Sequence, residues 1–400
     1  MRLLSFLALP LALAIPASAQ PQSEVTPEDR YAHERMIVLD THLDIPLRFD
    51  DGRWNFGERH RYEFDLSQVD LPRMIEGGLD GGFFVVYTPQ GELTPEGYRE
   101  ARDQALVRIA GIHRVIGENA ALRLALTAED AERLHEQGRR AAFISMENSW
   151  PLGEDLSLLA TFHRLGVRMA GPVHSRTNQL ADSTTGEARW NGLSPLGRQW
   201  VAEMNRLGMV IDASHSSDAA FDQMLELSET PIVLSHSGPK AIFDHPRNLD
   251  DERMRRLARA GGVMFINSIF LVAHDTSPER EALNERHESW ATLSAEERRR
   301  LLADTAALNA QRPYTSADFD LYMRSLLHAV GVMGVDHVGL GADWDGGGGV
   351  IGMEDIRLLP RITARLRREG FSEADIAKIL GGNALRVLMQ VQALSQPRGS

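Results

Sequence analysis

The arrangement of apolar segments constrains the fold of this chain more than any other feature of its sequence. Short runs rich in β-branched and aromatic residues alternate with longer amphipathic helical patterns almost to the end of the chain. This alternation is typical of βαβ units, in which helices connect parallel strands. Eight runs are predicted to be strands of one parallel sheet: 36–42, 82–88, 141–146, 167–173, 209–214, 231–235, 262–267 and 337–342. A ninth, weaker run at 122–126 is expected to form a short extra strand outside the main sheet.

Helical patterns fill the intervals, at 97–117, 155–165, 195–207, 217–227, 250–260 and 316–331, and Thr127 begins a sequence that resembles a capping box. Eight strands with intervening helices predict an α/β fold, a (β/α)₈ barrel of the TIM type, as a single domain over residues 20–400. An open, doubly wound sheet is the alternative, but no Gly-x-Gly-x-x-Gly sequence follows the first strand.

The stretch 275–315 is richly charged and helical in pattern. It is predicted to be a solvated helical insertion before the last strand. Within it, the basic run 296–300 is expected to be a solvated face of a helix.

The first nineteen residues have the pattern of a secretory signal peptide. Arg2 precedes the apolar run LLSFLALPLALAIP, which is followed by Ala17, Ser18 and Ala19, the small residues of a cleavage site. A membrane anchor is the weaker interpretation, because the run is shorter than the roughly 20 residues that a spanning helix needs. We therefore expect cleavage near Ala19 and a secreted, periplasmic chain with no stable membrane span.

Composition limits the chemistry that this chain can use. It has no cysteine, which excludes disulfides, thiolate nucleophiles and zinc–sulfur sites. The formal net charge of −13 argues against nucleic acid bound on a broad basic surface. A metal site here must therefore use histidine and carboxylate ligands, and a small substrate is favoured.

Side chains able to bind a metal stand at the ends of the predicted strands: His42, Asp44, Glu147, His174, His215, His236 and Asp343. In IVLDTHLDIP, His42 and Asp44 are one residue apart and would share a face of a strand. Taken alone, each such residue is as readily a turn or structural residue. The carboxyl ends of barrel strands meet at one mouth, however, and polar groups gathered there need neutralisation, which one or two divalent cations would supply.

The types of these side chains indicate hydrolysis. His215 and His236 each follow an apolar run directly, and imidazole nitrogens suit zinc. Glu147 has two carboxylate oxygens and can bridge two ions. Two cations about 3.5–4 Å apart would hold a water, lower its pKa toward about 7 and polarise a carbonyl group. Asp343 is placed to transfer a proton between the attacking water and the leaving amine.

Two further stretches admit competing interpretations. Arg247, in the loop after His236, offers a guanidinium fork for a substrate carboxylate, or it forms a surface ion pair with Asp250 or Asp251. The sequence from Asp343 to Glu354 matches several positions of a calcium loop, but Gly347 offers no side-chain oxygen there and a strand precedes it. Asp345 is therefore expected to cap this loop.

Short motifs run in a fixed order through the chain: VLDTHLDIP, GGLDGGFFVVY, PVHSRTNQLADS, GMVIDASHSS, VLSHSGPKAI, RNLDDE, HVGLGADWDG and SEADIAKILGGNALRVL. Together they resemble the membrane, or renal-type, dipeptidases of the amidohydrolase superfamily. The resemblance implies a barrel that holds two Zn²⁺ or other divalent cations. His42 and Asp44 would bind one ion, His215 and His236 the other, and Glu147 would bridge them.

By the same resemblance, His174 would contact the carbonyl or tetrahedral oxygen, Arg247 the terminal carboxylate, and Asp343 would transfer the proton. The implied activity is hydrolysis of dipeptides by metal-bound hydroxide, with tolerance of a C-terminal D-residue, and members of the family often form homodimers. The chain departs from the family at Thr41 and Leu43, where Gly and Asn are common, and at MENSW, which replaces a Glu-Gly-Gly run.

Other functions remain open at this point. The same metals in a different pocket would suit an N-acyl-amino-acid deacylase or a lactone-opening amidohydrolase. An inactive barrel that serves as a binding protein is the alternative from a different class. The full set of predicted ligands argues against it.

Overall fold

The structure, a computed structural model, describes residues 25–395, so the predicted signal peptide at 1–19 lies outside the described residues. The strands are β1 (Leu39–Leu43), β2 (Gly81–Tyr87), β3 (Leu122–Leu124), β4 (Arg140–Glu147), β5 (Val167–Ala170), β6 (Val210–Ile211), β7 (Val233–Ser237), β8 (Val263–Ile266) and β9 (Val338–Leu340). Among residues 25–395, the helices fall short of the length and apolarity that a membrane crossing requires.

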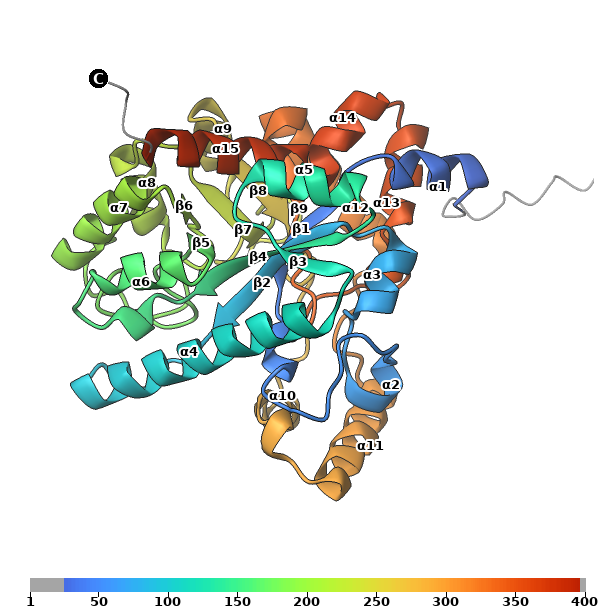
Figure 1. The fold of residues 1–400 in the computed structure, drawn as a ribbon, viewed down its shortest axis with the longest axis horizontal. Coiled ribbons are helices and arrows are strands. Elements are labelled where there is room, and N and C mark those ends of the chain that lie inside the picture. Colours follow the sequence, from blue (N-terminus) through green and yellow to red (C-terminus); the bar gives the residue numbers. More distant parts are fainter. Residues whose placement is uncertain (1–24, 396–400) are drawn as a thin grey trace, which may run out of the picture.

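Helices lie between and around the strands (Figure 1). They are α1 (Pro27–Glu34), α2 (Tyr62–Asp65), α3 (Leu71–Gly77), α4 (Pro95–Glu118), α5 (Ala128–Glu136), α6 (Leu158–Arg164), α7 (Pro195–Leu207), α8 (Asp218–Leu227), α9 (Asp251–Arg259), α10 (Pro278–Glu288), α11 (Ala295–Gln311), α12 (Phe319–Met333), α13 (Pro360–Arg368), α14 (Glu373–Ala377) and α15 (Asn383–Ser395). Capping side chains set several starts. Thr127 forms the predicted capping box of α5, and the hydroxyl of Ser194 accepts from the third residue of α7.

Eight parallel strands close the predicted (β/α)₈ barrel. β1, β2, β4, β5 and β6 are neighbours in one sheet, and β7, β8 and β9 in a second. Parallel bridges from Asp212 to Val233 and from Leu43 to Trp344 join the two sheets at both seams. At the seam between the first and last strands, the backbone N–H of Asp44 donates to the carbonyl of Trp344 at 2.8 Å. This closure is what brings the ends of distant strands to one mouth.

The run at 122–126 belongs to the main sheet, so the prediction that it lies outside is wrong. β3 pairs in parallel with the start of β4, with Leu122 opposite Arg140 and Leu124 opposite Ala142. β5 pairs only with the later part of β4, at Ile144 and beyond. β4 therefore extends past β5 at its amino end, and β3 satisfies backbone groups that would otherwise lack partners.

Two apolar layers hold the barrel. Inside it, residues near the strand starts, including Phe83 and Phe143 with ring centres 5.0 Å apart, pack with Leu388 and Val391 of α15. A larger layer lies between the strands and the outer helices. Figure 1 shows α15 at one end of the strands and α10 and α11 beyond the other. Because α15 fills the amino end, the carboxyl end is the one left open for a site.

The stretch 275–315 is a helical insertion before the last strand, as predicted, but it is not merely solvated. Leu283, Trp290 and Leu301 form a small core between α10 and α11. Arg298, from the run expected to be a solvated face, pairs with Asp51 at 2.5 Å and lies 5.0 Å from the centre of the Trp290 ring. A helical charge pattern shows that two faces differ, but it does not show which face packs on a neighbour.

Thr41, one of the departures from the family pattern, links three strands. Its buried hydroxyl donates to the carbonyl of Ser235 in β7 at 2.6 Å and lies 3.2 Å from the carbonyl of Leu340 in β9. β1 is thus tied to both strands by one side chain.

We expect Thr41→Val to lower the free energy of unfolding by about 1–3 kcal/mol, because a buried carbonyl loses its donor. Urea unfolding followed by circular dichroism measures the change. Thr41→Ser keeps the hydroxyl and is the matched control. A loss in Thr41→Ser with none in Thr41→Val would show that the methyl group, not the hydrogen bond, matters.

Candidate metal centre

One cavity collects the predicted site residues at the carboxyl end of the barrel. It has a volume of about 1490 Å³ and is lined by all eight of them: His42, Asp44, Glu147, His174, His215, His236, Arg247 and Asp343. They come from the ends of six different strands and the loop after β7. The prediction that the polar strand ends converge is confirmed by this geometry.

The carboxylate of Glu147 lies at the centre of the group. Its Oε1 is 3.1 Å from Nε2 of His215 and 3.4 Å from Nε2 of His236, and these two nitrogens are 2.9 Å apart. Its Oε2 is 3.7 Å from Nε2 of His42, which is 3.3 Å from Oδ2 of Asp44. The two oxygens of one carboxylate therefore face two different sets of donors.

These distances suit metal coordination. A tetrahedral zinc ion with bonds of about 2.0–2.1 Å holds its ligand atoms about 3.3 Å from one another. Both donor sets around Glu147 are close to that separation. In addition, Oδ1 of Asp44 is buried without a hydrogen-bond partner. The residues present thus fit a divalent cation without rearrangement.

Two of the site residues turn the chain sharply. His215 and Asp343 have φ angles of 65° and 67°, in the left-handed region that residues other than glycine rarely adopt. Each follows a short strand, and the turn redirects its side chain over the mouth of the barrel. Strained backbone of this kind is concentrated at functional sites.

Burial keeps the two facing imidazoles neutral. It lowers the pKa of His215 and of His236 well below the usual value, and the positive charge of Arg247 adds to the effect. Burial would also lower the pKa of His42, but the carboxylates of Asp44 and Glu147 raise it well above its usual value. Neutral imidazoles offer the lone pairs that a cation needs.

A serine and an aspartate orient one of these ligands. The hydroxyl of Ser235 donates to Oδ2 of Asp212 at 2.5 Å, so its own oxygen accepts from Nδ1 of His236 at 2.8 Å. This places the lone pair of His236 on Nε2, facing Glu147. The sequence analysis missed both residues, although Asp212 in VIDAS and Ser235 in VLSHS stand beside predicted ligands. Such supporting contacts are typical of metal-binding histidines.

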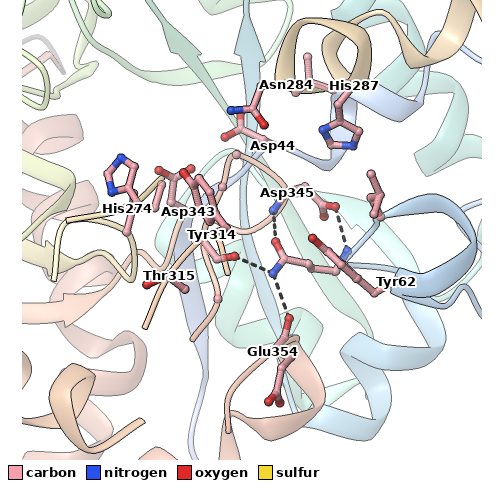
Figure 2. A pocket seen from close by; sticks show the side chains of 18 of the residues that line it. Asp44, Tyr62, His274, Asn284, His287, Tyr314, Thr315, Asp343, Asp345 and Glu354 are labelled. Carbon is pink, nitrogen blue, oxygen red and sulfur yellow. Dashed lines mark hydrogen bonds between the residues drawn. The ribbon is translucent and has the colours of Figure 1, made fainter. Parts of the chain in front are cut away.

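Asp343 lies beside Asp44, and Figure 2 shows both carboxylates at the cavity wall. Atoms of Asp343, Asp44 and His42 lie within 4.8 Å of one another. Burial raises the pKa of Asp343 well above its usual value, and the charges of Asp44 and Glu147 act in the same direction. A carboxyl group with a raised pKa accepts a proton more readily than an ordinary carboxylate, which suits a group that takes a proton and passes it on.

His174 and Arg247 face the same space. Nε2 of His174 is 4.0 Å from Oε1 of Glu147, and burial lowers its pKa. Arg247 is buried, donates to the carbonyl of His236 at 3.2 Å, and remains a cation with a pKa lowered by burial to about 10. The alternative of a surface ion pair is wrong, because Asp250 pairs with Arg253 instead.

Asp345 fixes the loop after β9 by bonds to the segment before α3, so the prediction that it caps its own loop is wrong. Its carboxylate accepts from the backbone N–H groups of Gln68 and Val69 at 2.8 and 3.1 Å. In the same loop, a Cβ at Gly346 would lie 2.1 Å from Oδ1 of Asp343 and 2.2 Å from Oδ2 of Asp44. Only glycine lets the backbone pass this close to the two carboxylates.

Comparison with known proteins decides the family. Residues 28–399 match the model of the membrane dipeptidase family, peptidase family M19. The chain belongs to this family. It is therefore a hydrolase of the metallo-dipeptidase class.

Relatives of the M19 dipeptidase span most of its length. Dipeptidase tcpJ of Claviceps purpurea is 32% identical over 82% of this chain and 70% of its own length. The probable dipeptidase PvdM from Pseudomonas aeruginosa is 30% identical, covers 92% of this chain and 98% of its own, and superposes with a TM-score of 0.78. A metallopeptidase from Rhodobacter sphaeroides, solved with a phosphinate mimic of L-Ala-D-Ala, is 26% identical with a TM-score of 0.71, over 89% and 99% of the two chains.

We expect Gly346→Ala to reduce dipeptide hydrolysis by about 100-fold, because a displacement of about 1 Å at a site can have that effect. Initial rates on the metal-loaded protein measure it. Gly331→Ala in α12 is the control, since a Cβ there meets nothing within 4 Å. Wild-type activity in Gly346→Ala would contradict the close approach.

Proposed function

We propose that this M19 protein is a secreted dipeptidase that uses two zinc ions and splits dipeptides with a free C-terminus. The observation that carries the proposal is the position of Glu147, whose two oxygens face separate donor sets at 3.1–3.7 Å. His42 and Asp44 would hold one ion, and His215 and His236 the other, with Glu147 between them. A bound pair of divalent cations would supply an activated water and polarise the scissile carbonyl.

The chain's own residues bind the substrate and move the proton. Arg247 would bind the terminal carboxylate, since its guanidinium is buried and lines the same cavity. His174 would donate a hydrogen bond to the oxygen that becomes negative during attack. Asp343, with its raised pKa, would take a proton from the attacking water and pass it to the leaving amine.

The substrate class includes peptides with a C-terminal D-residue in this proposal. The Rhodobacter sphaeroides relative, bound to a mimic of L-Ala-D-Ala, supports it.

Export to the periplasm is a further part of the proposal. It is supported by the apolar segment at 1–19 and its small-residue cleavage site.

We expect chelator-treated protein to regain activity as two equivalents of Zn²⁺ bind, measured by calorimetry and elemental analysis. His215→Ala should bind fewer equivalents, because one donor set loses a nitrogen. His328→Ala is the control, since that histidine pairs with Asp251 on α9, outside the site. A single equivalent in the wild-type protein would contradict the proposed pair.

Arg247→Ala should raise the KM for L-Ala-L-Ala and L-Ala-D-Ala by at least about tenfold, because a charged hydrogen bond to the carboxylate is lost. Amidated dipeptides lack that carboxylate. They should be poor substrates for the wild-type protein, and Arg247→Ala should raise their KM little further. An equal loss on acid and amide substrates would show that Arg247 acts elsewhere. Failure of the metal-loaded protein to cleave any dipeptide would overturn the proposed function.

A further inference from the structure

The cavity extends well beyond the metal centre. Sites for small molecules commonly have about 300–1,000 Å³, whereas this cavity has about 1490 Å³. A dipeptide of two small residues would occupy only the part near Glu147. The remaining wall is formed by the turn after β1, by α2 and by the 275–315 insertion. Figure 2 shows Tyr62, Tyr314, Asn284 and His287 around this part.

A buried arginine stands in that wall. Arg48 is four residues after Asp44, is 3% exposed and lines the cavity. Its Nη2 donates to the carbonyl of Asp65 at 2.6 Å and contacts Nε2 of His287, while its Nη1 is buried without a hydrogen-bond partner. Its guanidinium lies 4.4 Å from the centre of the Trp290 ring. One donor edge of a buried cation is thus left without an acceptor.

The carboxylates whose charges reach Arg48 are bound to other groups. Asp51 pairs with Arg298 at 2.5 Å, Asp65 accepts from an indole and a serine hydroxyl, and Asp345 accepts from two backbone N–H groups. Among the described residues, no carboxylate forms an ion pair with Arg48 within 4.0 Å. The partners of its guanidinium are a backbone carbonyl and an imidazole. A buried charge without a partner is unfavourable, and a guanidinium fork matches a carboxylate well.

Two phenols extend the same set of donors toward the metal centre. Burial raises the pKa of Tyr314 to about 12, and the charge of Asp343 also raises it. Tyr62 is 44% exposed, and its pKa is also raised, by partial desolvation of the phenol and by the charge of Asp345. Both hydroxyls therefore keep their protons and can donate. The charge of Arg48 acts on Tyr62 and that of Asp343 acts on Tyr314, so the two phenols stand in the stretch of wall that joins Arg48 to the proposed proton-transfer group.

The two arginines lie on opposite sides of the centre. Arg247 lies 5.3 Å from the centre of the Phe270 ring, which is 5.5 Å from the ring of His274, whereas Arg48 contacts His287. Figure 2 shows His274 and His287 on opposite sides of Asp343 and Asp44. A dipeptide whose terminal carboxylate meets Arg247 and whose scissile carbonyl lies at the centre would direct its amino-terminal residue toward Arg48.

We infer that Arg48, Tyr62 and Tyr314 form a subsite for an anionic side chain on the amino-terminal residue of the substrate. Dipeptides that begin with Glu or Asp are then preferred over neutral ones of the same shape. This inference rests on the proposed dipeptidase function and assigns the substrate class of the same site.

The test compares L-Glu-L-Ala with its neutral counterpart L-Gln-L-Ala. The zinc-loaded wild-type protein should cleave L-Glu-L-Ala with a kcat/KM at least about tenfold higher, as expected for hydrogen bonds to a charged group. Arg48→Gln should bring the ratio of the two values close to one. A wild-type ratio of one or less, with both dipeptides cleaved, would overturn the subsite but not the proposed function. Cleavage of no dipeptide at all would instead overturn the proposed function.

Arg286→Gln controls for damage to the insertion. Arg286 of α10 pairs with Asp304 of α11, and it is not among the residues that line the cavity. Arg286→Gln should keep the wild-type preference for L-Glu-L-Ala. Loss of the preference in this variant as well would show that packing of the insertion, not the charge of Arg48, sets it, and would overturn the inference.

Discussion

The metal centre depends on one constraint: several carboxylates, which repel one another, must be kept beside positively charged groups in the buried mouth of the barrel. Glu147, the last residue of the long strand β4, lies within 4.0 Å of imidazoles from four other strand ends. Although burial would raise its pKa, the charges of His174 and His42 lower it well below its usual value. Such a group is stable only when every carboxylate has donors or cations around it. Asp212 and Ser235 help to meet that requirement, because they orient His236 toward Glu147.

Much of this arrangement follows from sequence because both faces of a barrel strand are buried, which makes the strands readable as apolar runs. Ligand positions follow in turn, since polar residues at the ends of such runs can meet only at the mouth. The exact registers do not follow. β7 ends at Ser237 rather than at 235, so His236 lies inside the strand instead of following it. β3 pairs with the start of β4, a contact that the sequence pattern does not show. Contacts such as Ser235 with Asp212 join residues 23 positions apart.

The 275–315 insertion shows that a charged sequence pattern does not predict which parts of a segment are buried. Its sequence is polar enough to be solvated, yet Trp290 is 4% exposed and its ring contacts two arginine guanidinium groups. One of these comes from the barrel and the other from α11. The insertion is thus attached to the barrel by cation–π and ionic contacts rather than by an apolar face. A surface joined in this way can vary in sequence without disturbing the strands beneath it.

The seam between the first and last strands has a consequence for the order of assembly. Asp40 accepts from the backbone N–H of Ala342 at 3.0 Å, across 302 residues of chain, and the loop with Asp343 follows directly. While the ribosome is still making residues before 338, the half of the site near His42 has no closing partner. The closed mouth around His42 thus forms only after the last strand has been made. For an exported chain, the closed site would then meet the metal ions of the receiving compartment rather than those of the cytosol.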